Sequence, residues 1–68
     1  MNAKLLRSKM VLYGDTNATL ADALGISAQR FSAKINETNG AEFTKSEIAI
    51  IRIRYNLTSE EVVEIFFA

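Results

Sequence analysis

Few side chains in this 68-residue sequence could carry out covalent or metal chemistry. The chain contains no histidine and no cysteine, which removes the commonest catalytic base, the thiol nucleophile and the commonest metal ligands. Asp15 and Asp22 lie too far apart along two helical segments to act as a carboxylate pair. Glu60 and Glu61 are explained by the preference of helix N-termini for negative charge. We therefore expect a protein that is not an enzyme, with no catalytic residue, metal, cofactor or small-molecule ligand.

Side chains suited to recognition gather near the middle of the chain. A helix over about 28–35 would direct Phe31 and Ile35 inward, four residues apart. Its opposite face would carry uncharged residues that fit base edges in the major groove of DNA, namely Ala28, Gln29, Ser32 and Ala33. Gln29 can make a bidentate contact to adenine, and the alanines can pack on thymine methyl groups. This face predicts a site that is rich in A·T pairs.

Five helical segments must position these residues. Apolar spacing and punctuation place them at about 3–13, 17–24, 27–35, 44–55 and 59–67. Gly14 and Gly25 end the first two segments, and Ser27 is the N-cap of the third. The last two segments each begin with a capping box, formed by Thr44 with Glu47 and by Thr58 with Glu61. The isoleucine-rich stretch 48–53 could be a strand, but the boxes and the lack of a strand partner favour a helix. We predict one all-α domain over residues 1–68, a compact bundle of five short helices.

The overall composition looks electrically neutral, but the two halves of the chain differ. Residues 1–36 hold five basic and two acidic residues, a charge of +3, and residues 37–68 hold three basic and six acidic residues, a charge of −3. Such asymmetry suggests that one face meets an anion and another turns away from it. Apolar residues make up 49% of the chain, enough for a packed core. No signal peptide or bilayer-spanning run is evident, so we expect a cytoplasmic protein with no membrane partner.

The residues from 20 to 27 carry a resemblance to a known family. Their sequence, LADALGIS, places two short helices around a tight glycine turn, which is the helix-turn-helix arrangement. It resembles the core motif of Cro/repressor-type (XRE family) helix-turn-helix domains, and the order of helices and caps extends the resemblance over nearly the whole chain. The final segments resemble those of small phage or prophage regulators. The resemblance implies a lambda-repressor-like fold and a DNA-binding regulator of transcription.

Phosphate contacts are expected at the N-terminus of the second segment and along the flanks of the third. Asn17 stands where the family often has a glutamine that contacts the DNA backbone. The full set of expected phosphate contacts is Asn17, Ser27, Arg30, Lys34 and Asn36. Arg30 and Lys34 could instead be merely solvated cations.

Two departures from the family pattern stand out. Many relatives pair an arginine late in the first helix with a glutamate near the end of the recognition helix. The matching positions here are Met10 and Ile35, so we predict an apolar contact between them in place of the ion pair. The loop at 36–40 is longer than usual and carries Glu37 instead of a cation, which argues against strong phosphate binding there.

The last segment leaves the oligomeric state open. Val62 and Phe66 lie on one helical face, and Val63 and Phe67 lie on another. Either Val63 and Phe67 form a contact in a homodimer that reads a pseudo-palindromic operator in double-stranded DNA, or the terminal phenylalanines close the core. The alternative function is a helix-turn-helix fold used for protein–protein contacts, such as an antirepressor, because a fold alone does not fix function.

Overall fold

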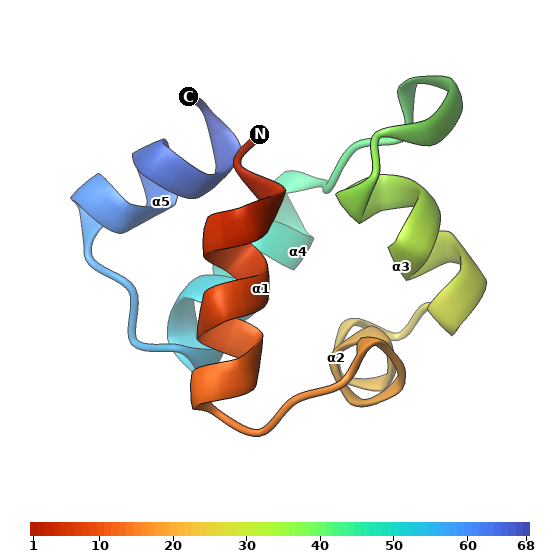
Figure 1. Cartoon of the computed structure of the whole chain (residues 1–68), viewed down its shortest axis with the longest axis horizontal. Helices are drawn as coiled ribbons and strands as arrows, with labels where there is room; N and C mark the ends of the chain where they lie inside the picture. Colours follow the sequence, from red (N-terminus) through yellow and green to blue (C-terminus); the bar gives the residue numbers. More distant parts are fainter.

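Five α-helices and one short 3-10 turn make up the protein. The structure, a computed structural model, describes all of residues 1–68 (Figure 1). The elements in chain order are α1 (Ala3–Leu12), α2 (Asn17–Leu24), α3 (Ala28–Ile35), η1 (Thr38–Gly40), α4 (Lys45–Arg54) and α5 (Ser59–Phe66). The all-α prediction is confirmed, and the stretch 48–53 is helical. Helices α1, α4 and α5 end one residue earlier than expected because Tyr13, Tyr55 and Phe67 are C-caps. None of the five helices has the length and apolar character needed to cross a bilayer.

Every helix begins with a side chain that accepts a hydrogen bond from a backbone N–H three residues later. The five N-caps are Asn2, Thr16, Ser27, Thr44 and Thr58. The two predicted glutamate capping boxes are confirmed. A third box opens α2, where the Thr19 hydroxyl accepts from the N–H of Thr16 at 2.9 Å. Side-chain caps satisfy N–H groups that a short helix cannot pair internally, and each contributes about 1 kcal/mol.

Three helices end with the same pair of backbone hydrogen bonds. After α2, the N–H of Gly25 donates to the carbonyl of Asp22 and that of Ile26 donates to the carbonyl of Ala21, which is a Schellman motif. The same pattern follows α1 at Gly14 and α4 at Asn56. Gly14 and Gly25 both have φ of 74°, and Asn56 has φ of 50°, which is the left-handed region. Each short helix therefore stops at a defined residue and the chain turns sharply into the next helix.

The core is built from side chains of all five α-helices and of the residues that follow α4. Ten apolar residues are buried: Leu6, Met10, Leu20, Ala21, Phe31, Ile35, Ile51, Tyr55, Leu57 and Ile65. Phe31 and Ile35 face inward as predicted, whereas Leu24 and Ile26 are only half-buried. Met10 and Ile35 belong to the same core, and their direct contact stays a prediction. In α5 the buried residue is Ile65, while Val63 and Phe67 are exposed. Of the two terminal phenylalanines, Phe66 is partly buried and packs against the core as that alternative expects, whereas the exposed Phe67 does not close it.

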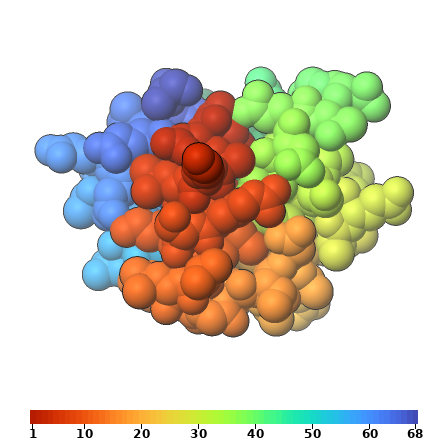
Figure 2. Space-filling view, viewed as in Figure 1, coloured from red at the N-terminus to blue at the C-terminus, as the bar shows by residue number.

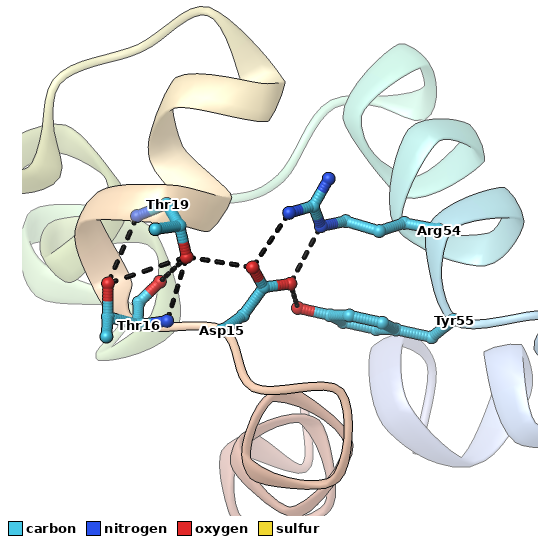
Figure 3. Close-up of polar contacts among 5 residues, drawn as sticks. All are labelled: Asp15, Thr16, Thr19, Arg54 and Tyr55. Carbon is cyan, nitrogen blue, oxygen red and sulfur yellow. Dashed lines mark hydrogen bonds and ion pairs between the residues drawn. The ribbon is translucent and has the colours of Figure 1, made fainter.

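The carboxylate of Asp15, in the α1–α2 connection, joins three parts of the chain (Figure 3). It accepts hydrogen bonds from Nε and Nη2 of Arg54, each at 2.7 Å, from the Tyr55 hydroxyl at 2.7 Å and from the Thr19 hydroxyl at 2.8 Å. The Arg54 guanidinium holds the pKa of the Asp15 carboxyl far below its usual range, against the opposing effect of burial. Burial, together with the bond to Asp15, raises the pKa of Tyr55. The Asp15 network thus fixes α2 against the end of α4.

All four ion pairs connect the first half of the chain to the second. Besides Asp15 with Arg54, they join Lys9 to Glu61, Lys34 to Glu47 and the N-terminal ammonium to Glu37. Glu47 and Glu61 are also the glutamates of the two capping boxes, so each carboxylate both caps its own helix and binds a lysine from another. The side chains outside these pairs leave a charge of +2 in residues 1–36 and −1 in residues 37–68, so the ion pairs halve the charge difference between the two parts of the chain.

Substitution of Asp15 by asparagine should destabilise the fold by about 2 kcal/mol at neutral pH, because it removes the charge to which three residues donate four hydrogen bonds. The pKa of Asp15 is lowered on folding, so its contribution is complete above the unfolded pKa and is lost as pH falls from about 4 toward the folded pKa. Urea unfolding at pH 7 and at several acidic pH values measures both effects.

Asp22→Asn is the matched control, because Asp22 is exposed and makes no ion pair or side-chain hydrogen bond. Its effect at pH 7 should stay within about 0.5 kcal/mol. Equal stability losses in the two variants would contradict the role given to Asp15.

Candidate nucleic-acid interface

Helices α2 and α3 form a helix-turn-helix unit. Only Gly25, Ile26 and Ser27 separate them, and the two helices pack against each other. Figure 1 shows α2 nearly end-on and α3 running across the view, so they cross steeply, as the short turn predicts. Ala21 is 1% exposed, and its small side chain allows the two helices to pack closely. The left-handed Gly25 and the Ser27 cap set the direction in which α3 leaves the turn.

The first turn of α3 projects into solvent. Ser27, Ala28, Gln29 and Arg30 are all exposed. In Figure 2 this segment lies in the yellow part of the chain at the right-hand edge of the molecule. Ser32 and Ala33 are half-buried, so the exposed face is strongest toward the N-terminal end of the helix. N-terminal residues of a recognition helix are the ones that reach base edges. Of the four residues expected to contact bases, Ala28 and Gln29 are therefore exposed to solvent, whereas Ser32 and Ala33 are exposed only in part.

Lys34 occupies a different environment from the one expected. Its ammonium donates to both carboxylate oxygens of Glu47, at 2.6 and 2.8 Å, and the side chain is only 9% exposed. Burial alone would raise the pKa of Glu47, but the hydrogen bond from Lys34 and that from the N–H of Thr44 lower it. Lys34 therefore joins the end of α3 to the start of α4. The expectation that Lys34 is a cation free to contact phosphate is wrong, because its charge is already paired in a buried site.

Arg7 lies beside α3, although no spacing in the sequence places it there. Its Nη2 donates to Oδ1 of Asn36 at 3.2 Å, which brings a cation from α1 to the C-terminal end of α3. The Nδ2 of Asn36 in turn donates to the Ser32 hydroxyl at 3.3 Å. Asn36 is exposed and hydrogen-bonded to the Arg7 guanidinium, a position compatible with a contact to the phosphate backbone of DNA. Only the folded chain reveals Arg7, because it is 29 residues from Asn36.

Two helix N-termini on this unit carry unpaired backbone donors. The N–H groups of Asn17 and Ala18 in α2 make no hydrogen bond, and neither do those of Ala28 and Gln29 in α3. Amides at a helix N-terminus, together with the helix dipole, favour anions such as phosphate. Asn17 is exposed at the start of α2, and Ser27 is exposed at the start of α3. Asn17 and Ser27, the two residues expected at these positions, thus lie next to free N–H groups that can donate hydrogen bonds to a phosphate oxygen.

Little positive charge is left unpaired on this side of the protein. The basic residues outside ion pairs are Lys4, Arg7, Arg30, Lys45 and Arg52. In the first 36 residues they are Lys4 and Arg7 on α1 and Arg30 on α3, and α3 itself carries no acidic residue. Arg30 is the one unpaired cation on α3. No group of three His, Cys, Asp or Glu side chains lies close enough to hold a metal ion.

The chain has no match among protein-family models, curated proteins or solved structures. What can be inferred about its function therefore depends on its own residues and their geometry.

Replacement of Lys34 by methionine should destabilise the protein by about 3 kcal/mol, because Glu47 would keep a buried and unpaired charge. The double variant Lys34→Met with Glu47→Gln should recover most of this loss, since glutamine is neutral and can still complete the capping box. Urea unfolding at neutral pH measures the three stabilities.

Lys45→Met is the control, because Lys45 is an exposed lysine outside any ion pair. We expect it to change stability by less than about 0.5 kcal/mol. A small effect of Lys34→Met, similar to that of the control, would show that the lysine is solvated after all.

Proposed function

We propose that the chain is a sequence-specific DNA-binding protein of the Cro/repressor helix-turn-helix type, which regulates transcription by placing α3 in the major groove of duplex DNA. The observation that supports this most directly is the pairing of α2 and α3 through a three-residue turn, with an exposed first turn of α3 that carries Gln29 and Arg30 and no acidic residue. A major groove admits one α-helix, and this arrangement is the one by which such folds present it.

In this proposal the exposed face of α3 reads bases. Gln29 offers both a carbonyl acceptor and an amide donor, the combination that matches adenine in the major groove. Ala28 and Ala33 would pack on thymine methyl groups, and the Ser32 hydroxyl can donate while it accepts from Asn36. Because no charged side chain lies among these four residues, we expect preference for A·T pairs over G·C pairs.

A second set of groups would contact phosphates without reading sequence. We assign this role to the exposed residues Asn17, Ser27 and Arg30, to the free amides beside them, and to Asn36 with Arg7. Arg30 and Arg7 are the cations in this set. Two phosphate contacts by cations give a slope of about −2 in the dependence of log affinity on log salt for one chain.

A shallow salt dependence means that electrostatic contacts contribute little to the DNA affinity of one chain. This favours the binding of two copies to one operator. Two chains on a pseudo-palindromic site would add their half-site contacts. The face that carries Val63 and Phe67 is a poor candidate for the contact between copies, since Glu60 and Glu64 flank Val63 and would meet their own counterparts across a two-fold axis. We therefore propose a homodimer that forms on DNA, as in a small phage or prophage regulator, with the α5 face left free.

The alternative function, a module that binds protein instead of DNA, draws support from one observation. Ion pairing leaves few free cations near α3, so a nucleic-acid contact has less electrostatic help than in a basic domain. The two functions predict opposite results in a DNA-binding measurement at low salt.

Fluorescence anisotropy with a labelled duplex of mixed sequence should show binding at low salt that weakens as salt rises. Selection from a random duplex pool should return A·T-rich sites. Gln29→Ala should reduce the preference for one base pair at one position of the site by about 1–3 kcal/mol. Arg30→Gln should weaken binding to all DNA sites alike and reduce the magnitude of the salt slope by about 1.

Arg52→Gln is the matched control for Arg30→Gln, because Arg52 is an exposed cation on α4 that contacts Ser59 of α5. It should leave DNA affinity unchanged. If the folded protein fails to bind duplex DNA at low salt, or if Arg52→Gln weakens binding as much as Arg30→Gln does, the proposal is wrong.

A further inference from the structure

A hollow of about 230 Å³ opens on the side of the protein near the chain ends. Figure 1 shows the two chain ends near each other, where α1 begins and α5 ends. Its apolar wall includes Phe43, Phe66 and Phe67, and the rings of Phe43 and Phe66 meet edge to face at 5.9 Å between centroids. Glu37 and Glu42 stand among the residues that line it. Met1, whose ammonium is paired with Glu37, and Lys34, which is paired with Glu47, line it as well. The hollow therefore combines an aromatic wall with charged groups.

The outer stripe of α5 continues from this hollow. Glu60 lies three and four residues before Val63 and Glu64, and Phe67 lies four and three residues after them, so the four share one helical face, and all are exposed. Val63 is 55% exposed and Phe67 is 67% exposed, values that are high for large apolar side chains. Phe67 also lines the hollow, so the stripe and the hollow form one continuous region. We call this region, made of the hollow and the stripe, the α5 surface.

The charge of the α5 surface is acidic. Glu42, Glu60 and Glu64 belong to no ion pair, and together they are three of the four acidic residues that remain unpaired in the chain. Lys34, at the hollow, is neutralised by Glu47. Arg52 lies at the far edge, where its Nη2 donates to the Ser59 hydroxyl at 3.3 Å. An anionic surface of this kind repels DNA and a second copy of itself, and it attracts a cation.

We propose that the α5 surface binds a basic amphipathic segment of another protein. A bulky apolar side chain of that segment fills the hollow against Phe43, Phe66 and Phe67. Its lysine or arginine residues lie over Glu42, Glu60 and Glu64. Exposed apolar area supplies the affinity, and the carboxylates select a basic partner over an acidic one. The exposed first turn of α3 is not part of this surface, so the partner and DNA can bind the same chain at once.

The experiment is an NMR titration of the ¹⁵N-labelled full chain with a short amphipathic peptide of lysine and leucine. Two matched peptides accompany it, one with serine in place of leucine and one with glutamate in place of lysine. We expect saturable shift changes at residues 37–43 and 59–68 with the first peptide only. Phe67→Ser should weaken binding about tenfold, and the double variant Glu60→Gln with Glu64→Gln about threefold at low salt.

Val11→Ser and Asp22→Asn are the controls, because Val11 is 79% exposed on α1 and Asp22 is an exposed unpaired acid on α2. Both should bind the peptide as the unaltered chain does. The proposal is overturned by equal binding of the serine peptide, by shifts centred away from the α5 surface, or by equal weakening in the controls. Concentration-dependent shifts at the α5 surface without peptide would assign it to a second copy and also overturn the proposal.

Discussion

The position of α2 against the end of α4 depends on how one carboxylate, that of Asp15, is satisfied. It follows the turn at Gly14 and accepts hydrogen bonds from Arg54, Tyr55 and Thr19. The Tyr55 ring is buried in the core, and the Tyr13 hydroxyl donates to the Tyr55 carbonyl at 2.9 Å. A chain of 68 residues without disulfides has a small core. Polar contacts that fix α1, α2 and α4 relative to one another therefore determine where the helix-turn-helix unit lies.

The sequence suggests that the positive half of the chain faces an anionic ligand, but ion pairs within the molecule use part of that charge. The positive half of the chain donates Lys9 and Lys34 to capping glutamates of the negative half, so these charges stabilise the molecule and do not attract a ligand. What remains outside is a sparse set of cations around α3 and an acidic, partly apolar face along α5. The two proposed surfaces therefore differ in sign and lie on different helices.

Much of the fold follows from local sequence signals. Cap residues, capping boxes and the glycines at 14 and 25 act within one turn of the chain, so the helices and their ends are predictable to within one residue. Helical spacing also identifies Phe31 and Ile35 as buried. The site is less predictable, because the state of a charged side chain depends on residues far along the chain. Lys34 meets Glu47 and Arg7 meets Asn36 only after folding, and nothing in the spacing of either residue indicates this.

The central claim, that α3 is the helix which contacts DNA, is tested most directly by an NMR titration of the ¹⁵N-labelled chain with unlabelled duplex DNA at low salt. The account predicts the largest amide shift changes at Asn17, Ala28, Gln29 and Arg30, where backbone donors or exposed side chains face solvent, and little change along α5. Changes centred on α5, or no change in the first turns of α2 and α3, would contradict it.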